Sequence, residues 1–164
     1  MALLSVADAL ARVLEHATPL PAEEAPLGEA DGRVLAHELK ARRTQPPADV
    51  SAMDGYAVRS ADVATAPIHL KVIGEVAAGR PFSRPLRPGE AARIFTGGVV
   101  PDGADTIIIQ EHTKRQGDDV EVAKPSAKGR HIRVQGLDFK AGEVLLTEGH
   151  RLTARDLALA AAMN

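Results

Sequence analysis

One stretch of sequence decides the fold: PPADVSAMDGYAVR, residues 46–59. Its two prolines favour an extended start, because proline has a fixed φ and keeps its predecessor out of the helical region. Asp54-Gly55 is a frequent turn dipeptide, and the residues that follow it predict a short strand. From about Thr44 to Lys140 the chain alternates short β-branched runs with Gly, Pro and Asp turns. This pattern predicts a small β-rich module.

Four further strands are predicted within this module. They are Ile68–Ile73, Ala92–Phe95, Thr106–Gln110 and Val120–Ala123. Between two of these runs, residues 116–119 (Gln-Gly-Asp-Asp) predict a hairpin turn. Because aromatic residues make up only 2% of the chain, the core is expected to rest on Val, Ile, Leu and Ala.

The flanking segments predict helices and short strands. Capping-box patterns at Ser5 and Thr153 open predicted helices at 5–16 and 157–163. Residues 29–39 predict a short helix that passes into a strand, with Gly32 as its weak point, and 144–146 predict another strand. The expected fold class is therefore α+β, mostly β. An apolar helix at the very end of the sequence, without a C-cap, suggests a chain cut from something longer.

Composition excludes several classes of function. There is no cysteine, so disulfides, cysteine-ligated metals and thiol nucleophiles are excluded. The 20 basic and 22 acidic residues give a net charge of −2 without long blocks of one sign, which argues against a nucleic-acid partner. No apolar run approaches the length of a membrane span, and the six histidines lack the spacing of a zinc site. A cytoplasmic protein without membrane association is expected.

The deciding stretch also carries candidate chemistry. Asp49, Ser51 and Asp54 would present oxygens from one loop, which suits a hard cation such as Mg²⁺ or a hydrogen-bonded substrate. The alternative is that Asp54 merely caps its turn, and spacing alone favours that alternative.

Three motifs carry a family resemblance. They are SAMDGYAVR at 51–59, RIFTGGVVPDGADTIIIQE at 93–111, and IRVQGLD at 132–138 followed by Ala141-Gly142. In this order they resemble the hallmarks of the MoeA family of molybdopterin molybdenumtransferases, which includes the E domain of gephyrin. The resemblance extends from about Leu20 to the end of the chain and implies the N-terminal portion of such a protein.

The resemblance implies a domain plan. Residues 1–20 would form an N-terminal helix that packs on a third domain, residues 21–44 and 140–164 a discontinuous first domain, and residues 45–139 an inserted β-rich second domain. The third domain, a catalytic α/β domain that follows in family members, would be absent from these 164 residues.

The family reaction inserts molybdenum from molybdate into adenylylated molybdopterin and releases AMP, with Mg²⁺ or a similar divalent cation. Family members are homodimers in which the active site is shared between subunits, so the 164 residues alone are expected to be inactive. Two alternatives come from other classes: a non-catalytic dimerisation or binding module, and a scaffold fragment like that of gephyrin.

By the same resemblance, five residues fall in or near the active-site cleft. Asp54 and Asp138 would act as catalytic carboxylates and hold the metal ion. Thr96, Arg133 and Ser51 would bind substrate, with backbone amides beside Thr96 offered to an anion and Arg133 meeting an oxyanion. Without the resemblance, Thr96 would simply end a strand, Arg133 would be a solvated charge and Asp138 would cap a turn.

Two motifs depart from the family pattern. Val50 stands where an Asn amide is usual, and the usual Arg-Arg-x-Gly-Glu-Asp reads Val134-Gln135-Gly136-Leu137-Asp138. One amide, two guanidinium groups and one carboxylate of the typical set are missing, so part of the pocket's contacts is expected to differ.

Overall fold

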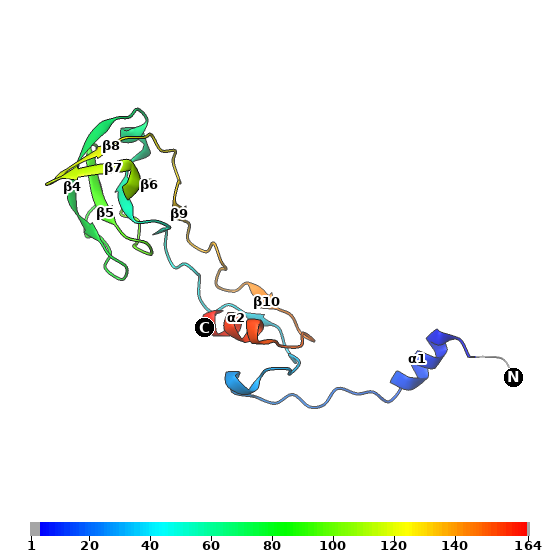
Figure 1. The fold of residues 1–164 in the computed structure, drawn as a ribbon. Helices are drawn as coiled ribbons and strands as arrows, with labels where there is room; N and C mark the ends of the chain where they lie inside the picture. Colours follow the sequence, from blue (N-terminus) through cyan, green and yellow to red (C-terminus); the bar gives the residue numbers. More distant parts are fainter. Residues whose placement is uncertain (1–3, 164) are drawn as a thin grey trace.

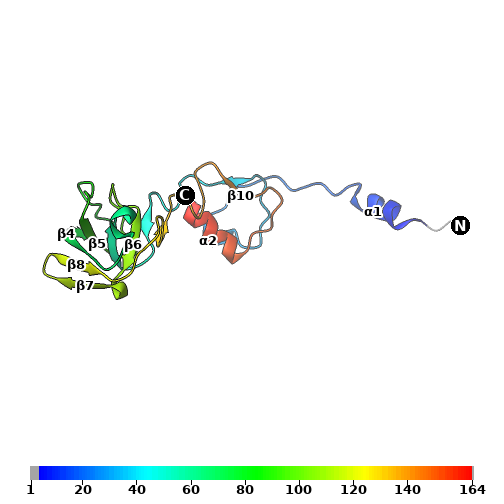
Figure 2. The same ribbon diagram turned by 90° about the horizontal axis from the view of Figure 1, so that it is seen from above.

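A computed structural model describes residues 4–163 as an elongated arrangement. A β-sheet occupies one end, a small unit around helix α2 the middle, and helix α1 the other end (Figures 1 and 2). The mostly β, α+β class expected from the sequence is confirmed. The domain boundaries at residues 20, 44 and 139 stay predictions.

The sheet has six strands in the order β6-β3-β5-β4-β8-β7. Its strands are β3 (Gly55–Val58), β4 (Ile68–Val76), β5 (Glu90–Ile94), β6 (Thr106–Ile109), β7 (Thr113–Gln116) and β8 (Asp119–Val122). All neighbours are antiparallel except β4 and β5, which run parallel. The four predicted strands are present with shifted ends, and the predicted hairpin turn joins β7 to β8. Short 3₁₀ helices, η2 (Ser60–Val63) and η3 (Gln110–His112), follow β3 and β6.

Both faces of this sheet are buried. Along β3, Tyr56 and Val58 belong to one core cluster and Ala57 to the other. On β6, Ile108 and Ile107 divide in the same way, because successive side chains of a strand point to opposite faces. The core of the sheet is aliphatic, as composition predicted, apart from Tyr56 in one cluster and the partly buried Phe82, which packs against the other cluster.

Two extended connectors join the sheet to the small unit (Figure 1). They are residues 45–51 and 132–139, and they run antiparallel. Strand β2 (Val50–Ser51) pairs with β9 (Ile132–Arg133) at one end, and Gln45 bridges Phe139 at the other.

The small unit packs α2 (Ala154–Met163) against β1 (Leu39–Lys40), β10 (Val144–Leu146) and the 3₁₀ helix η1 (Leu27–Glu29). The predicted strand 144–146 is present, and α2 begins three residues earlier than predicted. Its capping pattern is realised by Asp156, whose carboxylate accepts from the amide and the hydroxyl of Thr153 at 2.8 and 2.7 Å.

The helix predicted within residues 29–39 is wrong. Helical structure ends at Glu29, and only the strand part of the prediction holds, as β1. The Gly32 amide donates to Leu152 O, with Gly32 at φ +75°, and the Leu35 amide donates to His150 O. These amides therefore bond to a distant segment instead of to the carbonyl four residues earlier, which is the bond that a helix requires.

The predicted N-terminal helix is present as α1 (Val6–Leu14), capped by the Ser5 hydroxyl, which accepts from the Asp8 amide at 3.1 Å. No residue of α1 is buried. That it packs on a third domain stays a prediction. Within residues 4–163, no helix is long and apolar enough to cross a membrane.

Candidate functional site

Asp54 lies in the turn between β2 and β3 and contacts Thr96, far along the chain. Its Oδ1 accepts two hydrogen bonds, from the Thr96 amide and from the Thr96 hydroxyl, each at 2.8 Å. These two hydrogen bonds lower the pKa of Asp54 below its usual value, and the bond from the amide has the larger effect. The positive charge of Arg93 lowers the pKa further. Asp54 is therefore a carboxylate at neutral pH, and the first two motifs meet at this pair.

Arg93 completes this part of the site, although it was not among the predicted site residues. Its guanidinium lies over the rings of Tyr56 and Phe95, at 5.3 and 4.8 Å from their centroids. It donates to Gly55 O at 3.2 Å and to Gln110 Oε1 at 2.8 Å. The signal was present in the sequence, because Arg93 opens the second motif and two of only four aromatic residues lie in these motifs.

The glycines after Thr96 do not form an anion-binding loop. The Gly97 amide donates to Ser51 O, and the Gly98 amide donates to Phe95 O. With the Thr96 amide bound to Asp54, all three amides already have partners. The donors predicted for an anion are therefore occupied within the protein, and the bond of the Gly97 amide holds β2 in place.

Ser51 is buried, with 1% of its surface exposed. Its hydroxyl donates to Met53 O at 2.6 Å and accepts from the Met53 amide at 3.3 Å. A side chain placed in this way shapes the turn that presents Asp54 and does not itself face a ligand.

Arg133 and Asp138, from the third motif, form an exposed ion pair. Arg133 Nη2 donates to both carboxylate oxygens of Asp138, at 2.8 and 2.9 Å, and the two side chains are 47% and 41% exposed. The structure thus brings Arg133 to Asp138 and Asp54 to Thr96, as two separate pairs.

The two carboxylates lie at opposite ends of the connectors. The Asp138 amide donates to Gln45 O, whereas Asp54 lies just beyond Ser51 at the end beside the sheet. Between Gln45 and Ser51, an extended chain rising about 3.3 Å per residue spans up to about 20 Å. A divalent cation holds its oxygens within about 2 to 2.6 Å, whereas the Asp54 carboxylate is bound to Thr96 and the Asp138 carboxylate to Arg133.

Within residues 4–163, no three His, Asp or Glu side chains gather where they could hold a metal ion. The described residues therefore do not fit a divalent cation without further ligands, and the metal site at Asp54 and Asp138 stays a prediction.

The departures in the third motif have structural consequences. Gln135 ties the connectors together: its amide donates to Asp49 Oδ1 at 2.7 Å and its side chain donates to Pro47 O at 2.8 Å. Val134 and Leu137 stand exposed, at 51% and 56%. Apolar surface thus replaces charge beside Arg133.

Comparison with known proteins agrees with the three motifs. Residues 4–164 match the family described as MoeA N-terminal region (domain I and II). The chain belongs to the MoeA family. A molybdopterin molybdenumtransferase of Nostoc is 40% identical over 140 residues, which are 83% of this chain and 32% of the relative. Molybdopterin molybdenumtransferase 2 of Mycobacterium tuberculosis is 41% identical over 142 residues, 84% of this chain and 35% of the relative.

The fold agrees as well. A crystal structure of the molybdopterin biosynthesis MoeA protein from Pyrococcus horikoshii superposes with a TM-score of 0.81 at 42% identity, over 86% of this chain and 38% of that one. The chain therefore spans about a third of the length of these relatives and corresponds to their N-terminal portion.

Proposed function

We propose that this chain forms one wall of the cleft in which a molybdopterin molybdenumtransferase transfers molybdenum from molybdate to adenylylated molybdopterin and releases AMP. Support comes from family membership, from relatives that carry that enzyme name, and from the arrangement around Asp54. The carrying observation is the Asp54 carboxylate, held by two bonds from Thr96 and flanked by Arg93.

Each predicted residue has a role that its contacts support. Both bonds from Thr96 end on Asp54 Oδ1, so Oδ2 is the atom that would accept a proton from substrate or from an ordered water. Thr96 and Ser51 act through Asp54 as positioning residues. Arg133, half exposed and paired to Asp138, would exchange that partner for an oxyanion of the substrate, and Asp138 would hold the guanidinium ready until then.

The divalent cation and the dimer would be features of the full-length protein. Because no three His, Asp or Glu side chains gather among residues 4–163, further ligands would come from the rest of the protein or from a second subunit. We also infer a homodimer with a shared active site. The residues around Asp54 form anchored polar groups on one wall, and a second subunit would enclose the substrate from the other side.

The test is molybdenum insertion by the full-length protein, with adenylylated molybdopterin, molybdate and Mg²⁺, and with Asp54→Asn beside the wild type. Loss of the carboxylate should lower the rate roughly a hundredfold or more, the size of effect seen when one preorganised electrostatic group is removed. Asp118→Asn is the matched control, since that side chain is 83% exposed at the hairpin turn, and it should retain the wild-type rate.

Two further measurements keep the outcome clear. Thermal unfolding of Asp54→Asn should match that of Asp118→Asn, which separates lost chemistry from lost folding. Wild-type turnover by Asp54→Asn would refute the role of the carboxylate. No insertion by the wild-type full-length protein would favour the non-catalytic dimerisation module or scaffold instead.

A further inference from the structure

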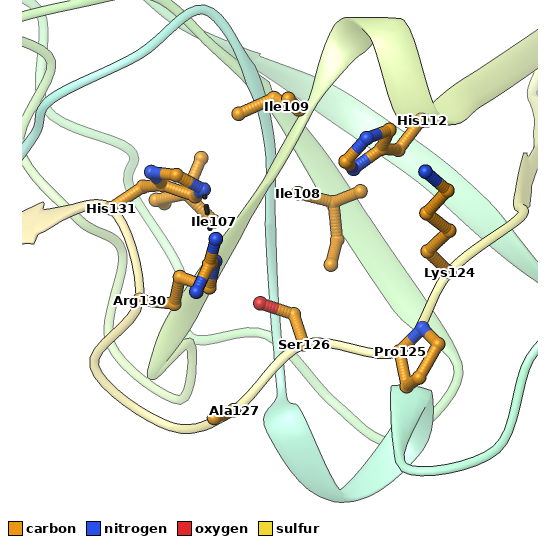
Figure 3. A pocket seen from close by; sticks show the side chains of 10 residues that line it. All are labelled: Ile107, Ile108, Ile109, His112, Lys124, Pro125, Ser126, Ala127, Arg130 and His131. Carbon is orange, nitrogen blue, oxygen red and sulfur yellow. Dashed lines mark hydrogen bonds between the residues drawn. The ribbon is translucent and has the colours of Figure 1, made fainter.

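A pocket of about 240 Å³ lies between β6, η3 and residues 124–131 (Figure 3). None of the five predicted site residues lines it. Its walls include His112, Lys124, Ser126, Arg130 and His131, with Ile109 as the partly exposed isoleucine of β6 on the apolar side. Pockets for drug-sized ligands begin at about 300 Å³, so this one suits a smaller molecule.

The wall opposite β6 is anchored along its length. Thr106 Oγ1 lies 3.1 Å from Ser126 Oγ and donates to Ala127 O at 2.8 Å. The Ile107 amide donates to Arg130 O at 3.0 Å. Thr106 is fully buried, so the bonds that fix this wall are shielded from water, and the pocket is a formed feature of the fold.

All four charged or titratable side chains that line the pocket are basic. His112 and Lys124 stand on one side and Arg130 with His131 on the other (Figure 3). Arg130 Nε donates to His131 Nε2 at 3.3 Å, and no ion pair within residues 4–163 involves Lys124 or Arg130. The whole chain carries a net charge of −2, so this positive cluster is a local feature.

His131 is a partly buried histidine beside other basic side chains of the pocket. Burial first, and then the charges of Arg130 and His112, lower its pKa below the usual value. Among residues 4–163 it is also the only non-glycine residue with positive φ, at 59°, a conformation that costs about 1 kcal/mol or more and is often retained where function requires it. The backbone turns here to place the imidazole beside Arg130.

We propose that this pocket binds a small phosphate monoester, with its dianionic head between Lys124 and Arg130 and its carbon portion against Ile109, the partly exposed isoleucine of β6. Two cations match a dianion better than a monoanion, and a guanidinium binds phosphate oxygens as a fork. The apolar side favours an ester over free phosphate, because only the ester has carbon to bury there. The inference does not depend on the proposed function, since binding requires no turnover.

The test is calorimetric titration of the 164-residue chain with isopropyl phosphate, inorganic phosphate and propionate. We expect saturable binding of isopropyl phosphate with a Kd on the order of 1 mM or below, weaker binding of inorganic phosphate, and the weakest binding of propionate. Equal affinity for inorganic phosphate and isopropyl phosphate would refute the preference for an ester and indicate a site for free phosphate. Tighter binding of propionate, or no saturable binding of any probe, would overturn the proposal.

Variants locate the site. Arg130→Gln and Lys124→Gln should each weaken isopropyl phosphate binding roughly tenfold, the effect of removing one charge-assisted hydrogen bond. Lys114→Gln removes the same charge from an exposed position on β7 outside the pocket and should leave the Kd within about twofold, as expected for a distant surface charge. Both pocket variants alter exposed side chains, so folding should persist. An equal loss of affinity in Lys114→Gln would show that phosphate is attracted by the overall surface charge, and it would refute binding in the pocket.

Discussion

The sheet and the small unit bury their side chains to different degrees. In the sheet, Val58, Ile94 and Ile107 are 0% exposed, enclosed on both faces. In the small unit, the best buried leucines, Leu146 and Leu152, still expose 6% and lie beneath a single helix. The comparison indicates that the sheet supports itself and anchors the turn of Asp54, whereas the small unit is held by few contacts.

The largest expected difference is in the cost of a cavity. Ile94→Ala in the sheet should lower the free energy of unfolding by about 4 kcal/mol, and Leu152→Ala in the small unit by about 2 kcal/mol, because a small core beneath a single helix relaxes more easily around the lost volume. Urea unfolding followed by the fluorescence of Tyr56, the single tyrosine in a chain without tryptophan, reports on the sheet, and circular dichroism at the helix band reports on α2 in the small unit. Equal losses would break the comparison.

A glycine of the first motif gives the next largest effect. A Cβ added at Gly55 would lie 1.9 Å from Ile108 O, a backbone atom that cannot move without displacing β6. Gly55→Ala should therefore destabilise the protein by about 3 kcal/mol, the upper end of the usual cost of overpacking.

Gly28, in the small unit, is the matched control, because a Cβ there meets nothing within 4 Å. Gly28→Ala should change the free energy of unfolding by less than about 0.5 kcal/mol. Chemical denaturation of the two variants side by side gives the contrast. A tolerated Gly55→Ala would mean that β3 and β6 separate easily and that the sheet is less rigid than its packing indicates.

The sheet was predictable because its signals are local. Alternating apolar runs and turn residues determine strands through contacts that each run makes on its own two faces. The failed helix within residues 29–39 depended on remote partners: the bonds of Gly32 and Leu35 end on residues 150–152, which no local pattern of residues 29–39 reveals.

The candidate site was likewise predictable only in part. Motifs pointed to Asp54, Thr96, Arg133 and Asp138, yet sequence spacing could not show which of them meet. Thr96 contacts Asp54 across 42 positions, whereas Asp138 pairs with Arg133. The basic pocket was missed because its histidines, separated in sequence, come together only when residues 124–131 fold back onto β6.

Acid should affect the small unit through Asp156, and this is the smallest effect expected. The hydrogen bond from the Thr153 hydroxyl, the His150 imidazole 3.0 Å away and the hydrogen bond from the Thr153 amide lower the pKa of Asp156 to about 2, from an ordinary value of 3.8. A carboxyl group with a lowered pKa in the folded state stabilises that state above its unfolded pKa, and the stabilisation is lost as the pH falls. The start of α2 should therefore loosen between about pH 4 and pH 2.

Circular dichroism at the helix band, recorded together with the near-ultraviolet signal of Tyr56, separates the two regions. The helix signal should decline over this pH window while Tyr56, 4% exposed inside the sheet, keeps its signal. Asp156→Asn should lack the decline, since its amide does not titrate, and this distinguishes α2 from α1. If both signals change at the same pH in the wild type, the small unit and the sheet unfold as one cooperative body. The connectors would then couple the stability of the two regions, contrary to this prediction.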